Sequence, residues 1–149
     1  MKDGRDAIVE LLYTYAERID LGDFEGVADL FSHGAITGDD DTVICEGREA
    51  VLAMYTGATR RYPDGTPRTK HVTTNAIVDV DEDAGTATCR SYFTVLQEVK
   101  GAVALQPVIS GRYHDRFERA DGEWRFTTRK MIPELIGELG HHLLYPYAR

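Results

Sequence analysis

The hydrophobic pattern of the chain changes near residue 68, and this change constrains the fold more than any other feature. Before it, apolar residues recur at three- and four-residue steps, which is typical of amphipathic helices. The first such set is Ile8, Leu11, Leu12, Tyr15 and Ile19. After the loop at residues 63–67, long stretches rich in Thr, Val, Tyr and Phe alternate with turn-forming residues. Helices followed by antiparallel strands predict an α+β fold, with helices packed on one face of a curved sheet.

The first part of the chain predicts three helices. Asp6 or a neighbour is expected to cap a helix that runs to about Ile19, and Gly22 supplies a left-handed stop after it. Asp23 is well placed to cap the second helix, and the third is expected to follow Gly47.

The remaining elements are predicted strands. Short strands are expected at 35–37 and 42–45, and long ones at about 69–80, 86–99, 102–119 and 123–131. We interpret residues 1–149 as one domain, with a core at about 6–131 and a C-terminal tail at 132–149. From His141 and His142 onward, the tail could be a strap, a short helix or a disordered segment.

Charge and composition exclude several classes of partner. The 149 residues include 17 basic and 25 acidic side chains, giving a net charge of −8, which argues against nucleic-acid or anionic-membrane binding. No apolar run approaches the roughly 20 residues of a membrane span. Cys45 and Cys89 lie far apart and form no zinc spacing, so a reduced, cytoplasmic protein is expected.

Asp20 and His71 are the candidate chemical pair. Asp20 ends a helical segment, where a carboxylate is mildly unfavourable unless solvent or a donor such as imidazole compensates it. His71 begins a strand in which His71, Thr73 and Asn75 alternate, so this polar row is expected to face a cavity. Together they would supply a base and the carboxylate that orients it. The alternatives are a solvated turn aspartate and an exposed histidine at a strand end.

The other histidines form no metal-ligand spacing, so no metal site is predicted. The sequence also lacks a Walker loop, a dinucleotide-binding glycine motif and a nucleophile elbow.

The order of residues resembles the SnoaL-like branch of the nuclear-transport-factor-2-like superfamily, over about residues 6–131. The segments that carry the likeness are 12–15 with 18–20, 22–25 with 30–31, 46–50, 69–71 with Asn75, and 111–117 with 121–126. The resemblance implies a cone-shaped, strongly curved antiparallel sheet packed against three helices. It also implies a homodimer or higher homo-oligomer, often formed through the sheet.

Members of this superfamily include scytalone dehydratase, the bile-acid 7α-dehydratase, a hexachlorocyclohexane dehydrochlorinase, ketosteroid isomerase, polyketide cyclases and binding-only domains. By position, Asp20 and His71 match the dyad of the dehydratase-like members. Tyr15 matches a tyrosine of the bile-acid enzyme, and Arg129 an arginine of the dehydrochlorinase. Strand alternation puts Arg129 opposite Trp124, so its entry into a pocket requires a bulge or bend.

One departure separates the chain from scytalone dehydratase, which has a second histidine on the next strand. Here that neighbourhood reads Cys-Arg-Ser-Tyr at residues 89–92. The resemblance therefore supports the dyad but not that substrate.

The resemblance and the residues together predict a cofactor-independent, dehydratase-type lyase. His71 would abstract a proton, Asp20 would orient it, and Tyr15 and Arg129 would donate hydrogen bonds to the substrate. A small, cyclic, largely apolar ligand such as a polyketide, steroid or terpenoid is expected. The residues expected to line its pocket are Tyr13, Phe31, Tyr55, Asn75, Tyr92 and Phe93.

Two alternatives use the same fold. The site could catalyse isomerisation or cyclisation instead of elimination. Or the chain could be a non-catalytic ligand-binding or dimerisation module, in which Asp20 and His71 are a polar pair closing an empty or lipid-filled cone.

Overall fold

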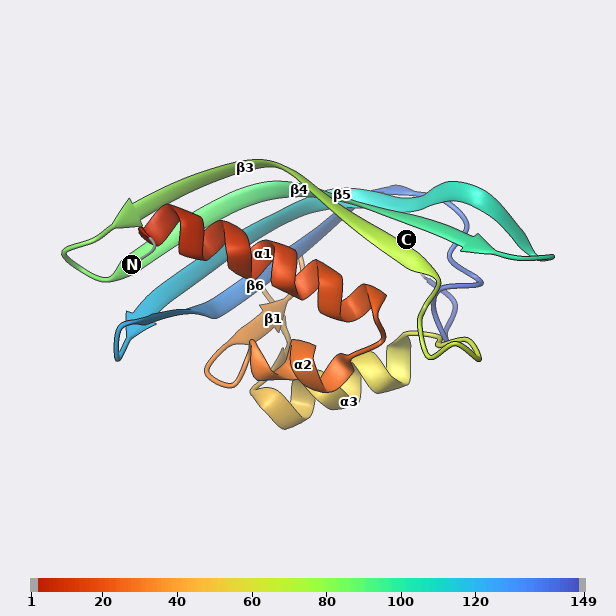
Figure 1. The fold of residues 1–149 in the computed structure, drawn as a ribbon, viewed down its shortest axis with the longest axis horizontal. Coiled ribbons are helices and arrows are strands. Elements are labelled where there is room, and N and C mark those ends of the chain that lie inside the picture. Colours follow the sequence, from red (N-terminus) through yellow and green to blue (C-terminus); the bar gives the residue numbers. More distant parts are fainter. Residues whose placement is uncertain (1–2, 148–149) are drawn as a thin grey trace.

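The computed structural model describes residues 3–147 and shows three helices on the concave side of one curved sheet (Figure 1). The helices are α1 (Gly4–Asp20), α2 (Phe24–Asp29) and α3 (Arg48–Ala58). The strands are β1 (Ala35–Thr37), β2 (Val43–Glu46), β3 (Thr69–Asp81), β4 (Thr86–Val99), β5 (Val103–Ala120) and β6 (Glu123–Ile136). The described helices include none long and apolar enough to cross a lipid bilayer.

The sheet has the order β2-β1-β6-β5-β4-β3. Every neighbouring pair is antiparallel except β1 and β6, which run parallel. The sheet is therefore mixed, which differs from the antiparallel sheet that the resemblance implies. The predicted α+β architecture, with helices on one face of a curved sheet, is confirmed.

The helix ends follow the predicted turn chemistry with one difference. Asp3, not Asp6, caps α1 by accepting a hydrogen bond from the Asp6 backbone N–H at 2.8 Å. Asp6 itself lies in the first turn, where its charge still favours the helix dipole. Gly22 has a φ of 76°, and Asp23 caps α2 by accepting from the Gly26 N–H at 2.9 Å, both as predicted.

A bulge in β3 changes which side chains face inward. Thr74 pairs with Tyr92 but Ile77 pairs with Arg90, so β3 contains one extra residue, and Asn75 has a φ of 55°. The less exposed row is Thr69, His71 and Thr73 before the bulge, and Ala76, Val78 and Val80 after it. The prediction that Asn75 shares the inward row of His71 is therefore wrong, because the bulge shifts the alternation.

A second bulge, in β6, buries Arg129. Phe117 pairs with Phe126 but Arg116 pairs with Thr128, which leaves one extra β6 residue between these pairs. Phe126 and Arg129 are consequently both fully buried, as the predicted bulge requires. The strand also continues to Ile136, so the tail starts later than residue 132, and residues 148–149 lie outside the described part.

An ion pair crosses the centre of the sheet. Arg129 Nε and Nη2 donate to the two carboxylate oxygens of Asp115 on β5, each at 2.9 Å, and neither side chain is exposed. The guanidinium carbon lies 3.7 Å from the centre of the Tyr113 ring and 4.2 Å from that of Tyr15. Burial alone would lower the pKa of Arg129, but Asp115 more than offsets this and the pKa is raised, so the guanidinium stays charged.

Asp115→Asn should lower the free energy of unfolding by about 3–5 kcal/mol, because it leaves the Arg129 charge buried and unpaired. Glu118→Gln is the matched control, since Glu118 on the same strand pairs with Arg125 at the surface. Its loss should stay below about 1 kcal/mol. Equal losses in urea unfolding would contradict a central role for the buried pair.

Candidate active site

Asp20 and His71 form a hydrogen-bonded pair at the junction of α1 and β3. His71 Nδ1 lies 2.7 Å from Asp20 Oδ1, and the two side chains are only 8% and 9% exposed. An ionised carboxylate can only accept hydrogen bonds, so Nδ1 carries the proton of the neutral ring. Nε2 is then the basic nitrogen, and His71 lines the largely apolar cavity described below.

Two further donors fix the Asp20 carboxylate. The His71 backbone N–H donates to Oδ2 at 2.7 Å, and the Thr69 hydroxyl donates to Oδ1 at 2.9 Å. Three donors, one from Thr69 and two from His71 at the start of β3, therefore converge on the last residue of α1. They also supply partners for a carboxylate at a helix C-terminus, where the helix dipole alone disfavours it.

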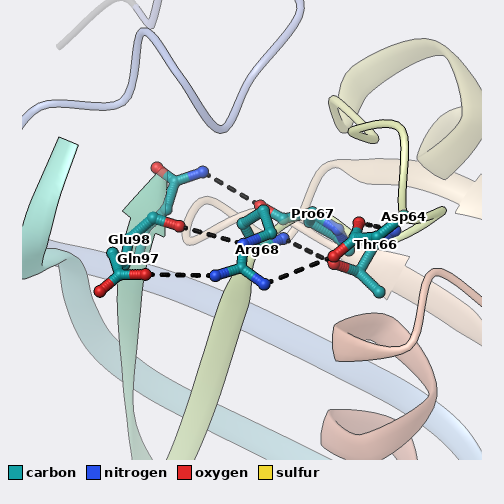
Figure 2. Close-up of polar contacts among 6 residues, drawn as sticks. All are labelled: Asp64, Thr66, Pro67, Arg68, Gln97 and Glu98. Carbon is teal, nitrogen blue, oxygen red and sulfur yellow. Dashed lines mark hydrogen bonds and ion pairs between the residues drawn. The ribbon is translucent and has the colours of Figure 1, made fainter. Parts of the chain in front are cut away.

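The turn before β3 holds these donors in place. Arg68 has a φ of 59°, and its guanidinium reaches the Glu98 side chain at 3.2 Å and Asp64 at 3.4 Å (Figure 2). The Gln97 side-chain amide donates to the Pro67 carbonyl at 3.1 Å. The start of β3 is thus tied to the end of β4, which fixes where Thr69 and His71 meet Asp20.

The cavity beside His71 has a volume of about 380 Å³. Residues from α1, α3, β3, β4, β5, β6 and the C-terminal segment line it. Its aromatic members are Tyr15, Tyr55, Phe93, Tyr113, Tyr145 and Tyr147. An apolar enclosure with a few convergent polar groups is the usual form of a small-molecule site.

Three buried tyrosines, Tyr15, Tyr55 and Tyr113, line this cavity. The Tyr15 and Tyr55 hydroxyls form a short hydrogen bond, and Tyr15 and Tyr113 meet edge to face. Burial raises the pKa of Tyr15, Tyr55 and Tyr113, so all three stay protonated at neutral pH. Each phenol therefore keeps a hydroxyl proton and can act as a hydrogen-bond donor.

His142 is a second imidazole in the cavity. Its ring centre lies 6.3 Å from that of His71, and its Nδ1 is buried without a hydrogen-bond partner among residues 3–147. Burial, together with the nearby His71, lowers the pKa of His142 to about 4. The ring is therefore neutral at neutral pH.

The structure brings several of the predicted site residues together. Tyr15, His71, Tyr55 and Phe93 line the cavity, and Asp20 lies directly behind His71. Arg129 does not line it, because its guanidinium is bound to Asp115 beneath the Tyr15 ring.

Four predicted lining residues lie elsewhere. Tyr13 is 55% exposed because it lies two residues from Tyr15, on another face of α1. Tyr92 is 49% exposed on the outer face of β4, since neighbours along a strand point to opposite faces. Phe31 is in the core and stacks on Phe126, while Asn75 is exposed at the β3 bulge.

Sequence reasoning missed several lining residues. Tyr113 alternates with the exposed His114, a signal that could have placed it on the inner face. Met131 follows the β6 bulge, and His142, Leu143 and Tyr145 lie in an irregular segment with no local pattern to place them. Within residues 3–147, no cluster of three or more His, Cys, Asp or Glu side chains is arranged to hold a metal ion.

Comparison with known proteins identifies one matching family model and many solved structures of similar fold. Residues 3–130 match the SnoaL-like domain. A protein of unknown function from Mycobacterium tuberculosis is 29% identical, covers 89% of this chain and 72% of its own, and superposes with a TM-score of 0.70. Curated protein sequences give no match.

Two structures from Novosphingobium aromaticivorans are also similar. One is a nuclear-transport-factor-2-like protein with a cystatin-like fold, 24% identical over 87% of this chain and 80% of its own, with a TM-score of 0.70. The other is a candidate scytalone dehydratase, 20% identical over 91% and 93%, with a TM-score of 0.67. At these identities the likeness shows the fold alone.

His142 should make the protein less stable in acid. Its pKa is about 4 in the folded state against an ordinary value of 6.5, so between these values the unfolded chain binds a proton that the folded chain does not. The free energy of unfolding attributable to this group should fall by roughly 3 kcal/mol as the pH drops from about 6.5 to about 4.

Urea unfolding of wild type and His142→Phe across this pH range measures the effect as a difference in slope. Leu144→Ala, a change two residues away at a side chain that does not titrate and does not line the cavity, should keep the wild-type slope. A His142→Phe slope equal to that of wild type would rule out this contribution.

Proposed function

Because the chain belongs to the SnoaL-like domain family of the nuclear-transport-factor-2-like superfamily, we propose that it is a cofactor-independent lyase of the dehydratase type. One observation carries the proposal: His71 is hydrogen-bonded to Asp20 through Nδ1 and borders an apolar cavity. Base, orienting carboxylate and hydrogen-bond donors are all side chains of this chain, so every proton transfer has a protein group to perform it.

The first step is proton abstraction by His71. Nε2 takes a proton from a carbon next to a substrate carbonyl, and the electron pair of that C–H bond moves toward the carbonyl oxygen. Asp20 holds the reactive tautomer and stabilises the imidazolium that forms. The Thr69 hydroxyl donates to the same carboxylate and helps to hold Asp20 in position.

The enolate-like oxygen needs hydrogen-bond donors. Tyr15 and Tyr55 line the cavity as a hydrogen-bonded pair, and the high pKa of both phenols keeps them protonated and able to donate. Arg129 stays beneath Tyr15, bound to Asp115, and we assign it the role of positioning the phenols and not of touching substrate.

The second step breaks the bond to the leaving hydroxyl. The enolate electrons form the carbon–carbon double bond, the C–O bond breaks, and the imidazolium of His71 gives its proton to the departing oxygen, which leaves as water. His71 thus ends neutral, and the substrate has lost one water overall. A small, cyclic, largely apolar hydroxy-ketone fits the cavity volume and its aromatic lining.

His71→Ala and Asp20→Asn should each lower kcat by about a hundredfold or more, because each disables the general base. Turnover of a panel of cyclic β-hydroxy ketones, followed by the absorbance of the conjugated product, measures the loss. His33→Ala changes an exposed histidine and should leave kcat unchanged.

Thermal unfolding of the same variants separates chemistry from structure. Midpoints near wild type with lost turnover support the dyad. Turnover that survives both changes, or a wild type that binds these ketones without converting them, would instead favour the binding-module alternative.

Tyr15→Phe should reduce kcat by about a hundredfold with KM little changed, because it removes a hydroxyl that stabilises developing negative charge. Tyr13→Phe makes the same chemical change two residues away on an exposed face of α1 and should have no effect. The two variants assayed side by side test the role of the phenol pair, and indistinguishable kcat values would argue against it.

A further inference from the structure

The chain after β6 is held firmly against the rest of the molecule. The Arg60 backbone N–H donates to the His142 carbonyl, and the Leu144 N–H donates to the Ala58 carbonyl, both at 2.9 Å. The Gln97 side chain donates to the His141 carbonyl at 3.0 Å. His142 therefore has a fixed backbone, set by the end of α3 and by β4.

The His142 side chain is buried at the cavity, and the described residues offer its Nδ1 no hydrogen-bond partner that would explain this burial. The residue is 7% exposed and lines the cavity, and Nδ1 has no partner among residues 3–147. Buried polar side-chain atoms almost always have a partner, and an exception calls for a ligand, a water or an ion. We infer from this that the hydrogen-bonding partner of His142 is not part of the described chain.

We propose that His142 is a substrate-binding residue that hydrogen-bonds an oxygen substituent of the ligand and so selects oxygenated rings over plain hydrocarbons. The inference rests on the proposed function only in placing the substrate in this cavity.

The geometry of the two imidazoles narrows the ligand. Their ring centres are 6.3 Å apart and the rings meet edge to face, so they are neighbours in the cavity wall and a single ligand can contact both. A neutral imidazole has one donor and one acceptor nitrogen, and the lowered pKa of His142 keeps it in that state. It therefore suits a hydroxyl or carbonyl oxygen better than an ionised group. The expected substrate is a cyclic compound with an oxygen substituent. That oxygen is on the ring from which His71 removes a proton, or on the adjoining ring.

The first experiment compares the binding of naphthol and naphthalene to the full chain by calorimetry, with naphthalene measured in competition. Wild type should bind naphthol about fivefold to tenfold more tightly, the value of one net hydrogen bond. His142→Phe should bring the ratio close to unity, and His142→Gln, which keeps a donor and an acceptor, should restore part of it. His141→Asn should behave as wild type. An unchanged preference in His142→Phe overturns the proposal.

A second measurement uses only the wild-type protein and so does not depend on whether a variant folds. Naphthol should shift the ring ¹⁵N resonances of His142 in wild type, whereas naphthalene should leave them in place. Equal shifts with both ligands, or none with either, overturn the proposal. Its failure and that of the lyase proposal are distinguishable, because binding preference is read without turnover. A naphthol preference carried by His142 in a protein whose His71→Ala variant loses no activity would reject the dyad chemistry alone.

Discussion

The buried pair between Arg129 and Asp115 is the constraint on which the rest of the structure depends. Two charges taken out of water are unfavourable unless geometry and hydrogen bonds offset the loss of hydration. Here the contact is bidentate, and the faces of Tyr113 and Tyr15 cover the guanidinium. A shift of one residue between β5 and β6 would turn one of the two side chains to the other face of the sheet and leave its partner buried and unpaired, so the pair fixes the register of the sheet centre. Tyr15 and Tyr113 pack on the same guanidinium and also line the cavity. The register of β5 and β6 therefore also fixes where these two side chains lie in the cavity wall.

The site itself joins two segments that are far apart in the chain. Asp20 is the end of α1, and the donors that hold it begin β3 after the turn shown in Figure 2. The Asp20 carboxylate lies at the C-terminal end of a helix, where the helix dipole disfavours a negative charge. Three hydrogen bonds to the carboxylate offset this unfavourable interaction. Rigid elements on both sides let a single short contact define the orientation of the imidazole.

Sequence patterns predicted the elements well, because helix periodicity, turn residues and caps are local signals. The proximity of Asp20 to His71 came from the family resemblance, which periodicity alone could not supply, and the order of the strands was not predicted. What failed was the face on which particular side chains lie. Asn75 was misplaced because a bulge of one residue reverses strand alternation, and no local signal marked it. Tyr13 and Tyr92 were assigned by residue type, although each lies on a face turned away from the cavity. His142 depends on where an irregular segment crosses the molecule, which follows only from its long-range hydrogen bonds.

The side chains of Leu143, Tyr145 and Tyr147 contribute to the cavity wall but are not among the hydrogen-bond partners of Asp20, although the His141 backbone shares the Gln97 amide with the turn before β3. Substitutions at Leu143, Tyr145 or Tyr147 would reshape the space next to His71 without touching the Asp20 contacts or the Arg129 pair. On the proposed function, this arrangement lets the range of accepted ligands change while the contact between Asp20 and His71 is retained. Among homologous chains, sequence differences that change the substrate range should therefore be concentrated in the segment that follows β6. The same segment is the most favourable place to begin laboratory evolution of new ligand binding in this fold.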